Sequence, residues 1–103
     1  MKAFKKDGVL FLAPESNLTA DVIEDNRKFF SLQIKENTDF SSIILDADMV
    51  EIVDSLGINL IIGLYRESEA SSKPFKIINA SEKFLKIAHF FKFPSIFIIE
   101  GRV

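Results

Sequence analysis

Apolar residues form five short runs in this chain, and each run is too short to make a helix. The runs cover residues 3–6, 9–13, 43–45, 75–78 and 95–100, and they are rich in phenylalanine and β-branched residues. Such runs are typical of buried strands. Asp7 and Gly8 separate the first two runs, and this dipeptide predicts a hairpin because glycine adopts the positive φ that a tight turn needs.

Three longer segments are predicted to be helices, the first from apolar residues at helical spacing and the second from a nearly continuous apolar run that extends into charged residues. The first should begin at Thr19 or Asp21 and run to about residue 35, and the second should cover about residues 56–68. The third begins after Ser81 and ends where Pro94 excludes helical angles for the residue before it. The second helix has Asp54 or Ser55 as its N-cap, since either side-chain oxygen can accept from its first amides. Its apolar arc should face the sheet, and Asn59 and Arg66 should face water.

Strands and helices alternate along the chain after the opening hairpin. This order predicts an α/β fold with a mixed, largely parallel sheet, an N-terminal hairpin and about three packed helices. The length of 103 residues fits a single domain over residues 1–103.

Composition narrows the range of functions. The net charge of −2 gives no electrostatic basis for binding nucleic acid, and the absence of cysteine excludes disulfides and thiolate metal sites. No run reaches the roughly 18 apolar residues of a membrane span, and residues 1–8 lack the apolar stretch of a signal peptide. These features predict a cytoplasmic protein that does not insert into membranes.

Ser55 is the most notable side chain for chemistry, because it lies at the predicted start of a helix. A phosphate there would find unpaired amides and the positive end of the helix dipole. The simpler alternative is that Ser55 only caps the helix.

Four carboxylates precede this helix: Asp46, Asp48, Glu51 and Asp54. They could hold Mg²⁺, but the pattern favours a solvated acidic loop. His89 has no acidic residue three or four positions away, which indicates a surface residue. We therefore predict no catalytic residue, no metal and no cofactor.

Gly57 lies in the first turn of the same helix, where alanine would be the better helix former by about 1 kcal/mol. Its presence predicts that a partner or a neighbouring strand approaches the backbone closely. Gly57→Ala is accordingly expected to leave stability little changed or raised while weakening the binding of a partner. Among Phe84, Phe90, Phe91 and Phe93, at least one should be exposed, because one helix face cannot bury all of them.

The sequence resembles the STAS domain family, the module of sulfate transporters and anti-sigma factor antagonists. The resemblance rests on the apolar-acidic run at residues 43–46, on residues 50–54, on the tetrapeptide Asp54-Ser55-Leu56-Gly57 and on the apolar helix after it. The order of the elements over residues 75–99 also fits, so the resemblance covers nearly the whole chain. It implies a mixed sheet with helices of this kind.

The resemblance implies a protein-interaction module that is not an enzyme. In anti-sigma factor antagonists the tetrapeptide carries the phosphorylated residue; Leu56 cannot accept phosphate, which leaves Ser55. The partner, an anti-sigma factor with a kinase fold, would bind through the following residues: Asp54, Ser55, Leu56, Gly57 and Asn59. A second branch, the accessory subunits of bacterial lipid-transport ATPases, has a compatible tetrapeptide and implies a constitutive subunit without a switch.

Overall fold

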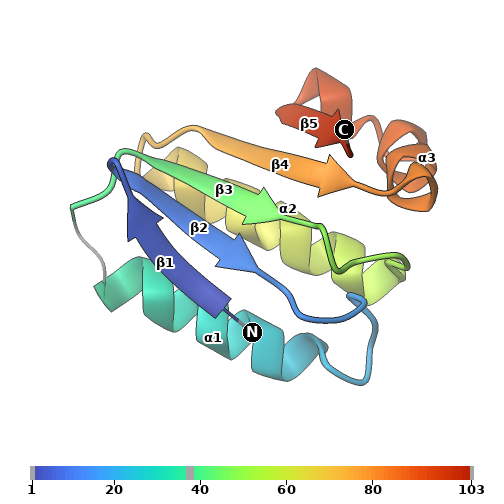
Figure 1. Cartoon of the computed structure of the whole chain (residues 1–103), viewed down its shortest axis with the longest axis horizontal. Helices are drawn as coiled ribbons and strands as arrows, with labels where there is room; N and C mark the ends of the chain where they lie inside the picture. The colour runs from blue at the N-terminus through green and yellow to red at the C-terminus, as the bar shows by residue number, and fades with distance from the viewer. Residues whose placement is uncertain (1, 37–38, 103) are drawn as a thin grey trace.

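The strands form one mixed sheet in the computed structural model, which describes residues 2–36 and 39–102 (Figure 1). Within these residues the sheet has five strands in the order β1-β2-β3-β4-β5. β1 runs antiparallel to β2, and all other neighbouring pairs are parallel. Their bounds are β1 Lys2–Lys6, β2 Val9–Ala13, β3 Ser42–Asp46, β4 Phe75–Ala80 and β5 Ile98–Gly101. The predicted mixed, largely parallel sheet is thereby confirmed.

The opening hairpin has the two-residue turn that the sequence predicts. Lys6 pairs with Val9 across the turn, and both turn residues have positive φ, 53° at Asp7 and 79° at Gly8. This backbone twist matches the right-handed twist of the two strands, which is why Asp-Gly is favoured there.

Two helices, α1 (Ile23–Glu36) and α2 (Ser55–Ala70), lie side by side on one face of the sheet (Figure 1). Each helix connects two neighbouring parallel strands, so both helices run in the same direction. The third helix, α3 (Glu82–Phe90), follows β4 and packs beside β5 together with a 3₁₀ turn, η1 (Phe93–Ser95).

The core is built from side chains that alternate along the strands and align across them. Leu10 pairs with Ile43, and Ile43 pairs with Phe75; one step further, Leu12, Leu45 and Ile77 form the next row. All six side chains are buried. The helices complete the core with a set of buried apolar side chains: Phe30, Ile58, Leu60, Ile61 and Leu64.

The predicted orientation of α2 is confirmed. Ile61 is fully buried, whereas Asn59 and Arg66 are exposed. The cap of α3 is confirmed as well, since the Ser81 Oγ accepts a hydrogen bond of 3.0 Å from the Phe84 amide. Of the four phenylalanines around α3, Phe90 is 80% exposed, so the expectation of an exposed ring also holds.

The first helix begins two residues after Asp21 and four after Thr19, the two predicted starts. α1 begins at Ile23, and residues 20–22 form a turn in which the Val22 amide donates to the Thr19 carbonyl at 3.0 Å. The physical reason is a tertiary contact, because the preceding residues bond to the segment before α2. The Leu18 amide donates to the Ile52 carbonyl at 3.0 Å.

The last strand also begins later than predicted. Residues 93–95 form η1, and the amides of Ile96 and Phe97 both donate to the Phe93 carbonyl, at 2.8 and 3.0 Å. The chain therefore continues to turn until Ile98, where β5 begins. Phe93 is 1% exposed, and its burial explains why this turn is retained.

Candidate functional site

Asp54 is the N-cap of α2, which decides between the two caps that the sequence left open. Its Oδ1 accepts hydrogen bonds from the amides of Leu56 and Gly57, both at 3.0 Å. Its Oδ2 accepts a third bond, 2.8 Å long, from the Ala20 amide in the segment before α1. The carboxylate thus caps α2 and also binds the segment that leads into α1.

Three amide donors also set the charge of this carboxyl group. Hydrogen bonds from Gly57, Ala20 and Leu56 hold the pKa of Asp54 below its ordinary value, because they stabilise the ionised form. Asp54 is therefore a carboxylate at neutral pH.

Ser55 is the first residue of α2, and it is exposed. The expectation that a phosphate on Ser55 would find unpaired helix amides was wrong for the amides of Leu56 and Gly57, since Asp54 already occupies both. A phosphate on Ser55 would instead stand next in sequence to a carboxylate. Its charge would be directed outward, toward solvent or a bound protein.

Gly57 is buried, and the close approach predicted for it comes from this chain itself. A Cβ at Gly57 would lie 2.2 Å from the Leu18 carbonyl oxygen and 2.7 Å from the Val53 Cγ1. The expectation that Gly57→Ala leaves stability unchanged or raised was therefore wrong. The backbone of Leu18 forms a parallel bridge with Val53 and fills the space that a side chain would need.

The segments 14–22 and 47–54 are fastened together by several polar contacts. The Leu18 carbonyl accepts from the Asp54 amide at 3.2 Å. The Asn17 Oδ1 accepts from the amides of Glu51 and Ile52, at 2.9 and 3.0 Å. These contacts fasten the segment before α2 to the segment before α1, next to the start of α2.

Arg102, which follows β5, also contacts the segment before α2. Its Nη1 pairs with the Glu51 carboxylate at 2.5 Å, its Nη2 donates to the carbonyls of Asp48 and Val50, and its Nε lies 3.9 Å from the Asp48 carboxylate. The sequence pattern does not point to Arg102. A lone arginine after the last strand gives no pattern that points to a partner about fifty positions away.

The acidic residues before α2 all have partners within the protein. Besides the groups held by Arg102 and the Asp54 cap, the Asp46 Oδ1 accepts from the Asn79 side chain at 3.0 Å and from the Asp48 amide at 3.1 Å. Over residues 2–36 and 39–102, no group of three or more metal-ligating side chains comes together. The structure thus describes this stretch as a hydrogen-bonded acidic loop.

Exposed apolar side chains lie near Ser55 in the sequence, from the acidic loop to the first turn of α2. Leu56 is 44% exposed, Ile52 48% and Met49 61%, and the polar Asn59 is exposed one turn further along α2. We call this set, Met49, Ile52, Ser55, Leu56 and Asn59, the α2 surface. The sequence predicts its three helical members but not Met49 and Ile52, which lie in the acidic loop and follow no regular spacing.

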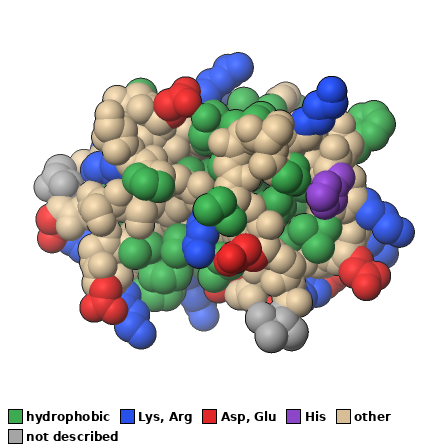
Figure 2. Space-filling view, turned by 90° about the horizontal axis from the view of Figure 1, so that it is seen from above, with side chains coloured by type: hydrophobic (Ala, Val, Ile, Leu, Met, Phe, Trp, Pro, Cys, Tyr) green, Lys and Arg blue, Asp and Glu red, His purple; other side chains and the backbone are tan. Residues whose placement is uncertain are grey.

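The remaining surface offers less that is organised for chemistry. Figure 2 shows acidic and basic side chains interspersed on the face it presents, with a histidine at the surface near hydrophobic side chains. His89 is exposed on α3, as predicted. None of the helices in the described part of the chain has the length and apolarity to cross a bilayer.

The Asp54 cap predicts a specific pH dependence of stability. Because the folded-state pKa lies below the unfolded value of about 3.9, the cap stabilises fully above that value and loses its contribution as the pH falls through the folded-state pKa. Asp54→Asn removes this titration. The difference in unfolding free energy between wild type and Asp54→Asn should be largest near neutral pH and shrink in acid, as chemical denaturation across pH would measure. A difference that does not vary with pH would contradict this assignment.

Comparisons with known proteins agree with this architecture. The family model described as STAS domain matches residues 1–103. A putative anti-sigma factor antagonist from Thermotoga maritima superposes with a TM-score of 0.88 at 18% identity, covering 99% of this chain and 86% of that one. No curated protein sequence gives a significant match.

Two further solved structures share the fold. The anti-sigma factor antagonist SpoIIAA in its unphosphorylated form has a TM-score of 0.78 at 20% identity, covering 97% of this chain and 86% of its own. An RsbS variant from Moorella thermoacetica has a TM-score of 0.76 at 17% identity, covering 99% and 86%. At these identities the likeness establishes the fold.

Proposed function

The chain belongs to the STAS family, and on that premise we propose that it is a non-catalytic module that binds an anti-sigma factor with serine kinase activity. The α2 surface is the proposed contact. The proposed setting is the cytoplasm, where ATP for such a kinase is available. Structural neighbours described as anti-sigma factor antagonists support this role.

One observation carries the proposal: an exposed hydroxyl and exposed apolar side chains occur together in a short stretch whose backbone is held by hydrogen bonds. Exposed apolar groups that cluster mark protein interfaces. Asp54 and Gly57 support this surface from within. Both carboxylate oxygens of Asp54 accept hydrogen bonds from amides of this chain, and Gly57 is buried. Ser55, Leu56 and Asn59 are the members of the predicted site that remain free to touch a partner.

The proposed switch is phosphorylation of Ser55. A phosphate adds about 1.5 to 2 negative charges at neutral pH. The amides of Leu56 and Gly57 are already bonded to Asp54, so they do not neutralise this charge. The phosphate would have to be desolvated at an apolar interface, which would release the partner.

The same observation supports a second candidate, a constitutive accessory subunit of an ABC-type lipid transporter. Leu56 stands at the third position of the tetrapeptide, where it cannot be phosphorylated, and the occupied amides offer no stabilisation to a phosphate on Ser55. In this candidate function the α2 surface binds a transport ATPase permanently.

Affinity capture from the native cell distinguishes the two candidates. Wild type, Ser55→Asp and a control, Ser95→Asp at an exposed serine in η1, serve as baits, and mass spectrometry identifies the captured proteins. The proposal expects an ATP-binding kinase-fold protein on wild type and on the control but not on Ser55→Asp. A transport ATPase captured equally by all three would establish the second candidate instead.

Arg102 should contribute to binding without touching the partner. Arg102→Gln removes its contacts to the loop that carries Met49 and Ile52, so the loop amides should exchange faster with solvent and partner affinity should fall several-fold. The expected loss of stability is about 1 kcal/mol, since the ion pair is partly exposed. Lys76→Gln is the control, because Lys76 forms a comparable exposed pair with Glu100 at 3.4 Å. Equal amide exchange in the two variants would rule out this positioning role.

A further inference from the structure

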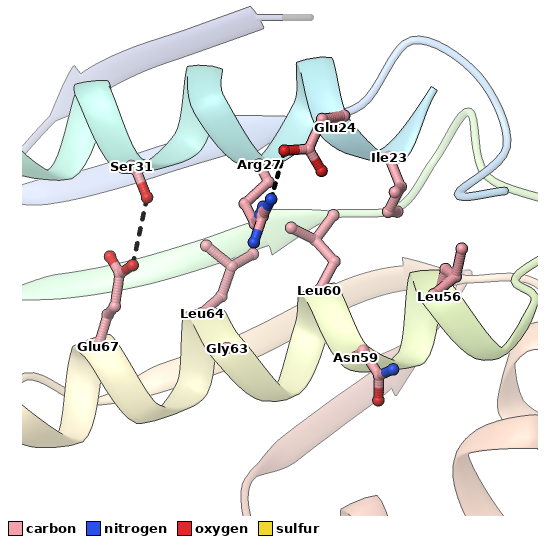
Figure 3. A pocket seen from close by; sticks show the side chains of 10 residues that line it. All are labelled: Ile23, Glu24, Arg27, Ser31, Leu56, Asn59, Leu60, Gly63, Leu64 and Glu67. Carbon is pink, nitrogen blue, oxygen red and sulfur yellow. Dashed lines mark hydrogen bonds and ion pairs between the residues drawn. The ribbon is translucent and has the colours of Figure 1, made fainter. Parts of the chain in front are cut away.

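A groove of about 450 Å³ runs between α1 and α2 on the side away from the sheet (Figure 3). Ile23 on α1 and Leu56, Leu60 and Leu64 on α2 supply its apolar lining. Leu60 and Leu64 are largely buried, whereas Leu56 at one end is exposed and belongs to the α2 surface. The groove is therefore continuous with the proposed contact.

Gly63 lies in the middle of α2 and lines this groove. A glycine inside a helix destabilises it by roughly 0.5–1 kcal/mol relative to alanine. At Gly57 the fold itself requires the missing side chain, but a Cβ at Gly63 would meet no atom within 4 Å. The packing of this chain therefore gives no reason for glycine at 63, and its absence of a side chain leaves the groove open.

The charges along the groove are unequally matched. Arg27 on α1 forms an ion pair with Glu24 one turn before it. Glu67 on α2 accepts only a hydrogen bond of 3.3 Å from the Ser31 hydroxyl, and no cation within the described part of the chain lies within ion-pair distance of it. Figure 3 shows Glu67 at the opposite end of the groove from Leu56. The Glu67 carboxylate can therefore pair with a cationic side chain of another protein.

The length of the groove along α2 is that of a short helical segment. Leu56 and Glu67 are separated by eleven residues, which at about 1.5 Å per residue gives a length of about 16 Å, or three helical turns. An amphipathic helix in an apolar groove is a recurring mode of protein recognition, with side chains three or four positions apart as anchors.

We propose that the groove binds an amphipathic helical segment of the same protein partner, with an apolar side chain over Gly63 and a lysine or arginine at Glu67. This inference rests on the proposed function, because it extends that contact from Leu56 along α2. It assigns to the partner a second point of attachment that phosphorylation of Ser55 does not alter directly.

The test is a titration of the partner purified from the capture experiment against matched variants. Gly63→Leu fills the groove, and Ala70→Leu adds the same side chain at an exposed position of α2 outside it. Glu67→Gln removes the charge but keeps an acceptor for Ser31. Thermal unfolding of each variant confirms that it is folded.

We expect Gly63→Leu to weaken binding at least tenfold and Ala70→Leu to leave it unchanged. Glu67→Gln should weaken binding several-fold, and this difference from wild type should shrink at high salt, which a merely structural role for Glu67 would not produce. Equal affinity of Gly63→Leu and wild type would overturn the proposal. So would self-association of the chain through this groove, detected by sedimentation as a dimer that Gly63→Leu abolishes.

The Ser55 variants separate this test from that of the proposed function. If Ser55→Asp weakens binding and Gly63→Leu does not, the groove proposal fails and the α2 surface stands. If Ser55→Asp and Gly63→Leu both bind as wild type does, the proposed function and the groove proposal both fail.

Discussion

Gly57→Ala is expected to lower the free energy of unfolding by roughly 1–3 kcal/mol, the usual cost of forcing atoms into a packed site. The new Cβ would lie 2.2 Å from the Leu18 carbonyl oxygen, so backbone has to move. That movement disturbs the bridge between Leu18 and Val53. Urea denaturation of the purified variant measures the effect.

Gly63→Ala is the matched control, since it makes the same change in the same helix. With no atom within 4 Å of the new Cβ, only helix propensity acts, and stability should rise by about 0.5–1 kcal/mol. The two substitutions thus have opposite expected signs. Equal effects of both variants would mean that Leu18 does not approach α2 as the structure describes.

Ser55→Asp is expected to weaken partner binding at least a hundredfold, which corresponds to about 2.7 kcal/mol. The new carboxylate would have to be desolvated at the α2 surface, next to Asp54, whose oxygens are committed to amides. Isothermal titration against the purified partner measures the loss.

Ser55→Ala is the companion variant. It should bind as wild type does, and it should keep its stability because the N-cap of α2 is Asp54 rather than Ser55. Intact mass of the protein from growing and stressed cells would show whether Ser55 is phosphorylated. Equal affinities for the two variants, together with no phosphorylated species, would leave the constitutive subunit as the remaining candidate.

Local patterns were sufficient to predict most of the fold. Short apolar runs located the strands and a longer apolar run located α2, because the length of a buried run differs between strands and helices. Asp7 and Gly8 predicted the hairpin, since both need positive φ, and Ser81 predicted the start of α3. Each of these features depends on residues within a few positions of one another.

Contacts between distant segments account for what the sequence did not reveal. Asp54 and Ser55 were equivalent caps by local rules, and the third bond, from Ala20, belongs to a segment 34 positions earlier. α1 begins at Ile23, later than predicted, because residues 18–20 bond to Asp54 and to the segment before it.

The candidate site was predictable only in part. The tetrapeptide and Asn59 followed from the helix pattern and the family resemblance. The contacts that hold the acidic loop were not predictable, because the role of Arg102 depends on where β5 places it beside this loop. Gly57 gave the correct inference of a close approach, but only the structure identifies Leu18 as the approaching group.

Amide hydrogen exchange of the chain with and without its purified partner tests most directly whether the start of α2 is the binding surface. The proposed function predicts slower exchange on binding in residues 47–60, and the groove proposal extends the protection along α2 past Gly63. The exposed end of α3 around Phe90 should not change. Protection confined to α3 and β5, with residues 47–60 unchanged, would contradict the account.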